Sequence, residues 1–442
     1  MSHFASIQPC SSWGRVARTP LPVATPQFRD QLPSLLAEKT GGSKLAVGLR
    51  RSYGDSVINS GGSLVDMTHL DRIIAFDMDK GKITAEAGIS ISDILKLTVP
   101  HGWFTATTPG TRFVTLGGAV ANDVHGKNHH QAGTFGCSVE ALELQRSDQS
   151  LHKLFAKDGS ALFKATVGGL GLTGAIRAVT LNLTPIRSAH LDVERVAFGH
   201  VRDFFALAAD SEKSHEHTVA WIDCACGHSS LGRGIFQRSN WATEGSLDAH
   251  NDNRAWRVPM DAPGFALNSL TLRLFNALYY RLQKWGKECQ RLHYMPVFYP
   301  LDAILNWNRL YGRRGFYQYQ CVIPRAEAPA AIEELLQRIA RSGAGSFLAV
   351  LKTLGPKPSP GMLSFPHEGI TLALDFANKG DSTLKLLASL DRIVHDAKGR
   401  LYPAKDGRMP AEMFRAGYPC LEEFVQQIDP AFNSDFWKRV SA

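Results

Sequence analysis

Residues 107–136, TTPGTRFVTLGGAVANDVHGKNHHQAGTFG, place three histidines and a lysine among closely spaced glycines. His125 and His129 are four residues apart, a spacing that on a helix brings two imidazoles to one metal ion. The glycines around them disfavour a helix, and no glutamate stands between the two histidines, so a metal site is the weaker interpretation. We instead predict a glycine-rich wall along a flat cofactor, with His125 and Lys127 facing the reacting group. For His129 and His130 we expect structural roles.

A second glycine-rich loop is expected in residues 46–62, AVGLRRSYGDSVINSGG. A short apolar strand runs into Gly48 and is followed by small polar residues and two arginines. Because glycine has no Cβ, its backbone N–H groups can approach a phosphate closely. The lysine-containing P-loop pattern is missing, so two interpretations remain, a plain turn or an anion-binding loop.

Residues 165–176, ATVGGLGLTGAI, contain a G-x-G-x-x-G spacing at Gly169, Gly171 and Gly174. In a Rossmann nucleotide site this run opens a helix. Here it leads into AIRAVTLNL, whose alternation of apolar and polar residues predicts a strand. We therefore do not expect nicotinamide dinucleotide binding, and we interpret the glycines as room for a cofactor ring or a neighbouring backbone.

A fourth candidate is residues 401–409, LYPAKDGRM, which group Tyr402, Lys405 and Asp406 in a short loop. Lys405 is either a surface lysine paired with Asp406 or a cation that orients a substrate hydroxyl and stabilises negative charge.

The elements around these motifs predict an α+β chain with a change of pattern near Pro185. Before it, short strands are separated by glycines; after it, helices and strands follow one another at wider spacing. Strands are expected at 44–47, 62–66, 82–87, 139–145, 175–183, 191–197, 217–224, 316–323, 346–352 and 369–376, and helices at 28–40, 89–98, 199–211, 327–341 and 410–427. We predict a first domain of residues 1–186, completed by 399–442, and a second of residues 187–398.

Composition limits the class of protein further. The 442 residues are 44% hydrophobic and 20% charged, which excludes a disordered chain. The net charge of +8 mildly favours anionic ligands or an anionic membrane surface, and without a long Lys/Arg run no nucleic acid is expected. The seven cysteines are irregularly spaced, which predicts free thiols in a reducing compartment. The first residues lack a basic and apolar leader, and 18 consecutive apolar residues occur nowhere, so a cytoplasmic protein is expected.

Residues 254–293 form a basic stretch in which leucines recur at helical spacing, from Leu267 to Leu282. A basic amphipathic helix of this kind is either an ordinary surface helix or a peripheral contact with an anionic membrane. The basic residues are Arg254, Arg257, Arg273, Arg281, Lys284, Lys287 and Arg291, against the acidic Asp261 and Glu288.

The motifs, in their order along the chain, resemble one family. The segments GLRRSYGD (48–55), TPGTRFVTLGGAVANDVHGKNHHQAGTFG (108–136), ATVGGLGLTG (165–174) and YPAKD (402–406) are similar to FAD-linked oxidoreductases of the vanillyl-alcohol-oxidase superfamily, with its PCMH-type FAD-binding domain. Among these the chain most resembles the decaprenylphosphoryl-β-D-ribose 2-oxidase group, and it is similar also to aldonolactone oxidases.

The resemblance implies a fold and a set of site residues. It implies a PCMH-type domain of two α/β subdomains that binds FAD non-covalently, with residues 46–56 around the pyrophosphate, and a substrate domain with a large antiparallel sheet. The implied catalytic residues are His125 and Lys405. The implied cofactor contacts are Gly48, Arg51, Ser52, Tyr53, Gly54, Asp55, Gly110, Thr111, Thr115, Gly117, Gly118, His125, Gly174, Ile176 and Tyr402. The implied substrate contacts are Lys127, Tyr311, Gln318, Gln320 and Lys352.

The sequence departs from the family pattern at several positions. Arg50 stands where the family loop usually has a second glycine. Either the backbone turn at this position differs from that of the family, or the arginine side chain adds a contact with a phosphate. Ala373 stands where the mycobacterial enzymes have a pocket cysteine, so inhibitors aimed at that thiol should not react here. Thr371 and Leu354 replace an asparagine and an aromatic residue, which leaves the substrate open.

The activity that the resemblance implies is oxidation of a secondary hydroxyl of a sugar, 2′-OH to ketone on a polyprenyl-phosphate-linked pentose of the cell wall, by hydride transfer to flavin N5. A short-chain reductase would then act on the keto product. Two alternatives stay open: an aldonolactone or sugar-alcohol oxidase that uses O₂, and a flavin-free lipid-binding module at a membrane surface.

Overall fold

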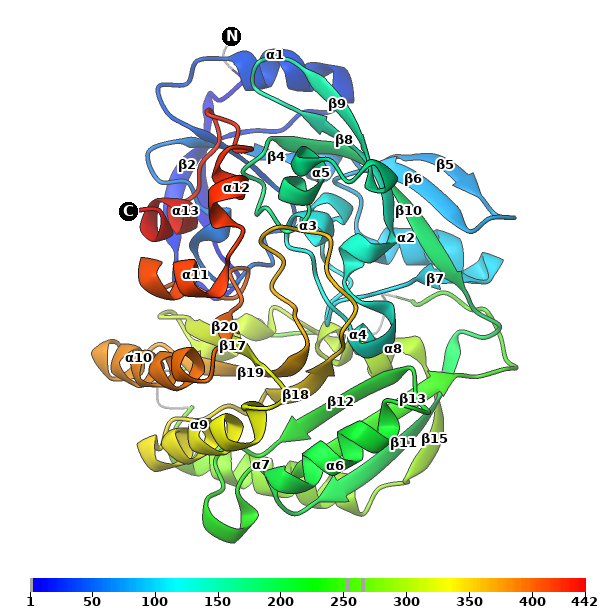
Figure 1. The fold of residues 1–442 in the computed structure, drawn as a ribbon, viewed down its shortest axis with the longest axis vertical. Coiled ribbons are helices and arrows are strands. Elements are labelled where there is room, and N and C mark those ends of the chain that lie inside the picture. Colours follow the sequence, from blue (N-terminus) through cyan, green and yellow to red (C-terminus); the bar gives the residue numbers. More distant parts are fainter. Residues whose placement is uncertain (1–2, 252–254, 264–266) are drawn as a thin grey trace.

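The computed structural model describes residues 3–251, 255–263 and 267–442, which form an α+β protein with three main sheets (Figure 1). The first two sheets lie in the upper half of the view and the largest sheet in the lower half. The first sheet has the order β1 (Ser6–Ser11), β2 (Arg18–Ala24), β4 (Ser63–Asp66) and β3 (Lys44–Val47).

The second sheet carries two of the glycine-rich segments, residues 107–136 and 165–174, between its strands. Its order is β5 (Ile73–Asp77), β6 (Lys82–Glu86), β10 (Ala175–Pro185), β8 (Val139–Gln145) and β9 (Leu151–Phe155), with β7 (Trp103–Thr105) paired to the end of β10. Strand β10 follows the 169–174 glycine run directly, so the strand expected at this point is confirmed. The helices α2 (Ile91–Thr98), α3 (Leu116–Ala121), α4 (His129–Ala132) and α5 (Ala161–Thr166) lie between these strands in the sequence.

The third sheet is large and antiparallel, as the family resemblance implied. Along each strand, alternate side chains face opposite sides. On β19, Leu372 and Leu374 face the core, whereas Thr371, Ala373 and Asp375 face a cavity. The strand order is β15 (Cys289–His293), β11 (His190–Phe198), β13 (Gly234–Trp241), β12 (His217–Ile222), β18 (Ala349–Leu354), β19 (Gly369–Ala377), β17 (Phe316–Ile323) and β20 (Arg400–Leu401).

Three helices cover the core face of this sheet, and the cavity lies against the other face. Helix α6 (Val201–Ser211) contacts β12 and β13, α9 (Ala328–Ser342) contacts β19, and α10 (Asp381–Asp396) contacts β17. The helix α7 (Ser269–Lys284) and the short α8 (Tyr294–Phe298) contact β11, and the parallel pair β14 (Trp256–Arg257) and β16 (Ile304–Leu305) stands apart from the large sheet. In the described part of the chain, no helix is both long and apolar enough to cross a membrane.

The C-terminal segment links the large sheet to the first one. After β20 the chain forms α11 (Ala411–Gly417), α12 (Leu421–Val425) and α13 (Asp435–Val440). The N–H of Lys44 in β3 donates to the carbonyl of Ala431 at 2.6 Å. The division of the chain at 186 and 398 stays a prediction.

Two expected helices are wrong in extent. The helix expected over 410–427 is two helices, because Pro419 removes a backbone N–H and its ring clashes with the preceding turn. The helix expected over 28–40 is a 3₁₀ turn, Arg29–Gln31, followed by α1 (Leu32–Ala37).

Candidate functional site

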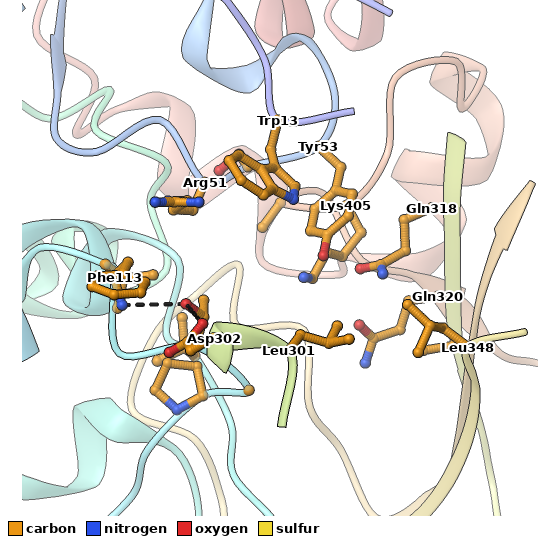
Figure 2. Close-up of a pocket in the computed structure, with 18 of the residues that line it drawn as sticks. Trp13, Arg51, Tyr53, Phe113, Leu301, Asp302, Gln318, Gln320, Leu348 and Lys405 are labelled. Atoms are coloured by element: carbon orange, nitrogen blue, oxygen red, sulfur yellow. Dashed lines mark hydrogen bonds between the residues drawn. The ribbon is translucent and has the colours of Figure 1, made fainter. Parts of the chain in front are cut away.

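A cavity of about 1070 Å³ separates the glycine-rich segments from the large sheet. It is larger than the roughly 300–1,000 Å³ of most small-molecule sites, which suits an extended ligand or two ligands together. One wall is built from residues 46–53, 108–118 and 170–176, which are far apart in the sequence. The opposite side is built from residues of β17, β18 and β19. Figure 2 shows Gln318, Gln320 and Lys405 directed into one part of this cavity, with Trp13 and Arg51 in another.

The glycine wall is close-packed behind its surface. A Cβ on Gly48 would lie 2.1 Å from Oγ1 of Thr115, and one on Gly117 would lie 2.8 Å from Cβ of Ala87. The Thr115 hydroxyl accepts the N–H of Gly118 at 3.2 Å, which caps α3. Only glycine therefore lets these two loops meet and leave a flat backbone surface toward the cavity.

Arg51 gives this wall a buried donor. Its guanidinium carbon lies 4.1 Å from the ring centroid of Trp13 and 5.6 Å from that of Phe113. Its Nε atom is buried and has no hydrogen-bond partner among the described residues. Buried polar groups are nearly always paired, so an unpaired guanidinium N–H beside a glycine loop fits an anionic group such as a diphosphate. The residues present thus fit FAD.

Arg50 has the left-handed backbone conformation that favours glycine. Its φ of 51° lies in the left-handed region, and its Nη2 atom donates to Oδ2 of Asp66 at 2.9 Å. The guanidinium of Arg50 is thus paired with a carboxylate at the end of β4.

Three lysines line the polar end of the cavity. Lys352 Nζ lies 3.2 Å from Nδ1 of His125 and 3.3 Å from the Gly126 carbonyl. Burial, together with the charges of Lys127 and Lys405, lowers the pKa of Lys352 to about 7. Burial likewise lowers the pKa values of Lys127 and Lys405 to about 8. These amines can therefore gain or lose a proton near neutral pH.

His125 is fixed on both ring nitrogens. Besides the Lys352 contact at Nδ1, its Nε2 lies 2.9 Å from the side-chain amide of Gln320. Burial and the neighbouring lysines lower its pKa well below the usual value, so the ring is neutral at pH 7. Tyr402 packs beside it, at 5.9 Å between ring centroids, and donates its hydroxyl to the Asn122 carbonyl at 2.9 Å.

Asp375 is a cavity residue that the sequence analysis missed. Its Oδ1 accepts the amide of Gln318 at 2.7 Å, and its Oδ2 accepts the hydroxyl of Tyr311 at 3.4 Å. Burial raises its pKa to about 7. Alternation along β19 was the available signal, because Asp375 lies two residues after Ala373 and therefore on the same face.

Asp302 was also missed, and no local pattern marks it. It accepts the Thr111 hydroxyl at 2.6 Å and the Arg112 N–H at 2.9 Å, which fixes the loop between them. These partners are about 190 residues earlier in the chain, a pairing that only the folded structure reveals.

The structure places most, but not all, of the expected site residues on the cavity. The lining includes Gly48, Arg51, Ser52, Tyr53, Gly110, Thr111, Thr115, Gly117, Gly118, His125, Lys127, Gly174, Ile176, Gln318, Gln320, Lys352, Tyr402 and Lys405. Lys405 is no surface lysine: its Nζ lies 4.0 Å from the centroid of the Tyr53 ring.

Three expected site residues lie outside the lining, each with a different contact. A Cβ on Gly54 would overlap the Asp406 carbonyl at 1.6 Å, so this glycine serves packing. Asp55 forms an ion pair with Arg439 at 2.8 Å. Tyr311 is stacked on Phe316, and its hydroxyl donates to the cavity residue Asp375 at 3.4 Å.

The histidines beside His125 have structural contacts, as expected. His129 Nδ1 accepts the N–H of Gly355 at 3.1 Å, and His130 Nε2 lies 2.9 Å from the His215 carbonyl. Within the residues that the structure describes, no group of three or more His, Cys, Asp or Glu side chains is arranged to hold a metal ion.

Comparison with known proteins agrees with this geometry. Residues 20–154 match the FAD binding domain family. Decaprenylphosphoryl-beta-D-ribose oxidase of Mycolicibacterium smegmatis is 36% identical over 97% of this chain and 96% of its own length. An uncharacterised Streptomyces coelicolor protein is 31% identical over 80% of this chain and all of its own. L-gulonolactone oxidase of Mus musculus is 29% identical, over 28% of each chain. The chain therefore belongs to the family of FAD-dependent oxidoreductases that includes decaprenylphosphoryl-β-D-ribose oxidase.

Proposed function

We propose that this protein oxidises the 2′-hydroxyl of a polyprenyl-phosphate-linked pentose to a ketone, with hydride transfer to N5 of a non-covalently bound FAD. The observation that carries the proposal is the cavity itself, in which a glycine wall with an unpaired Arg51 donor faces a buried group of amines and amides. A relative named for decaprenylphosphoryl ribose matches almost the whole chain, which supports this substrate class over a lactone.

The roles of the cavity residues follow from their positions. The loops around Gly48 and Gly117, together with Arg51, would hold FAD, which supplies the two-electron acceptor when bound. Lys405 is close to Asp375 and has a pKa of about 8, so its neutral amine can accept the proton of the substrate hydroxyl. Lys127 and Lys352 offer positive charge to a phosphate, whose approach would favour their protonated forms.

The first test is bleaching of the bound flavin without oxygen. The purified protein is expected to be yellow, and polyprenyl-phosphate pentoses should bleach it, whereas sugar lactones should not. Absorbance of the flavin band measures this directly. Bleaching by lactones, with peroxide release in air, would instead identify an aldonolactone-type oxidase, and a colourless protein that takes up no FAD would support the flavin-free module.

The second test concerns the link between flavin and protein. Among the described residues that line the cavity, the histidine is His125 and no cysteine is present. Both ring nitrogens of His125 are engaged, so this imidazole is not free to form a covalent bond with the flavin. Acid precipitation should therefore release all the flavin into the supernatant. Yellow colour that remains in the pellet would contradict non-covalent binding.

We also propose, from the family resemblance, that a short-chain reductase consumes the keto product and that the protein acts at the inner face of the membrane. A ketone next to a phosphate-linked carbon is a substrate for a hydride-donating enzyme. Adding such a reductase with its reduced cofactor to the reaction should convert the product to an epimeric alcohol, which chromatography would detect.

A further inference from the structure

Helix α7 has an exposed apolar face that no described segment covers. An ordinary surface helix has polar residues on its outer side, and a contiguous row of exposed large apolar side chains marks an interaction site more often than a free surface. Leu270 and Leu274 are 75% and 69% exposed, and Trp285, directly after the helix, is 79% exposed. The face consists of Leu270, Leu274, Phe275, Leu278, Leu282 and Trp285.

The opposite side of α7 is firmly attached to the protein. Leu272 and Asn276 are buried, and the Asn276 amide donates to Oδ1 of Asp223 at 3.0 Å and to the Ser346 carbonyl at 3.2 Å. The orientation of the helix is therefore fixed, and the leucines on its outer side are held in solvent.

The same helix forms one side of the cavity. Thr271, Phe275, Tyr279 and Gln283 line it, one helical turn apart from each other. Phe275 belongs both to this lining and to the exposed face. Apolar surface is thus continuous from the outside of α7 to the interior of the cavity.

A second exposed segment, around Trp256 and Met260, borders the cavity. Trp256 and Met260 are 80% and 73% exposed. Trp256 is in β14, which pairs with β16, and both residues of β16, Ile304 and Leu305, line the cavity. The rim therefore carries exposed large apolar side chains on two separate elements.

Basic side chains accompany this apolar rim. On α7, Arg273, Arg281 and Lys284 follow one another along the side next to the leucines, and all three are exposed. Of the acidic residues nearby, Asp261 is occupied by an ion pair with Arg15. Apolar and tryptophan side chains beside lysine and arginine are the combination that binds an anionic bilayer.

We propose that the outer face of α7, together with Trp256 and Met260, docks this protein on an anionic lipid bilayer, so that the prenyl tail of the substrate enters the cavity along α7. The tail part of this proposal rests on the proposed function; the docking part does not.

Vesicle binding tests the docking part with the holoenzyme and no substrate. The protein should co-sediment with phosphatidylglycerol/phosphatidylcholine vesicles and much less with phosphatidylcholine alone. The double variant Leu274→Glu/Leu278→Glu should bind the anionic vesicles about tenfold or more weakly, because it places two charges in the apolar face. The matched control Ile7→Glu/Val425→Glu, at exposed apolar positions elsewhere, should bind like the wild type. Flavin content and melting temperature check that all variants are folded.

Several results would overturn the docking proposal. These are no binding to anionic vesicles, equal binding to neutral vesicles, or the same loss in both double variants. The competing possibility is that a second copy of the chain binds this face. Sedimentation velocity without lipid tests it. A wild-type dimer that Leu274→Glu/Leu278→Glu converts to monomer would assign this face to self-association instead.

A comparison of dissolved and membrane-embedded substrates tests separately whether the prenyl tail enters the cavity along α7. The Leu274→Glu/Leu278→Glu variant should be bleached normally by a water-soluble, short-prenyl substrate and about tenfold more slowly by a long-prenyl substrate embedded in vesicles. Equal rates with the embedded substrate would overturn entry along α7. If neither substrate bleaches even the wild type, the proposed function fails while the vesicle result still stands.

Discussion

Replacing Lys405 by methionine is expected to slow substrate-driven flavin reduction by about 100-fold or more, the usual contribution of a group that accepts a proton in the reaction. Methionine keeps the length of the side chain and its packing over Tyr53 but has no amine. Flavin content should stay near that of the wild type, because Lys405 lies at the polar end of the cavity. Anaerobic stopped-flow measurement of the flavin band gives the rate.

The pH profile separates a proton acceptor from a simple positive charge. The pKa of Lys405 is lowered to about 8, so the neutral amine becomes more abundant as the pH rises through 8. The wild-type reduction rate should therefore rise through that range, and Lys405→Met should lose this rise. Lys405→Arg keeps the charge but stays protonated, so it should also be slow. Lys80→Met, at an exposed lysine, is the control. An unchanged rate in Lys405→Met would remove Lys405 from the mechanism.

Replacing Gly48 by alanine should weaken FAD binding and leave the protein pale. The new Cβ would lie 2.1 Å from Oγ1 of Thr115, so one of the two loops of the cofactor wall must move. Overpacking of this kind costs about 1–3 kcal/mol, or roughly 5- to 150-fold in FAD affinity if the free protein relaxes and the bound form cannot. Titration of the apoprotein with FAD measures the change.

A second substitution shows whether the overlap itself is the cause. The nearest atoms to the new Cβ are the Oγ1 and Cγ2 atoms of Thr115. The double variant Gly48→Ala/Thr115→Ala removes both and should bind FAD more tightly than Gly48→Ala alone, even though the α3 cap is lost. Gly227→Ala, where a Cβ would meet nothing within 4 Å, should behave like the wild type. Tight FAD binding by Gly48→Ala would refute the close-packed wall.

The sequence predicted the single loops and strands of this site better than the way they come together in the folded chain. Glycine runs and strand alternation were enough to expect the loop at Gly48 and the strand that became β10. The pairing of His125 with Lys352 joins residues 227 positions apart, and only the family resemblance brought them into one list. Asp302 had no local signal at all, because its partners are distant loop atoms.

Helix α7 shows a second limit of prediction from the sequence. Recurrent leucines in residues 267–282 indicated an amphipathic helix, and the helix is present. Periodicity gives the apolar face but not what covers it. The structure buries Leu272 and Asn276 instead and turns Leu274 and Leu278 outward, because Asn276 is anchored by hydrogen bonds to Asp223 and Ser346.

Arg50 links its loop to β4, and this should make positions 50 and 66 change together during evolution. A non-glycine residue in the left-handed region costs about 1–2 kcal/mol, and the contact with Asp66 offsets part of that cost. Asp66 also accepts the N–H of Thr68 at 3.1 Å and its hydroxyl at 2.7 Å, so a relative with glycine at position 50 still gains from a capping residue at position 66. That cap can be a neutral asparagine or serine, whereas arginine at position 50 favours a carboxylate. Correlated occurrence of arginine at position 50 and a carboxylate at position 66 among relatives would show that the side-chain pair offsets the backbone cost.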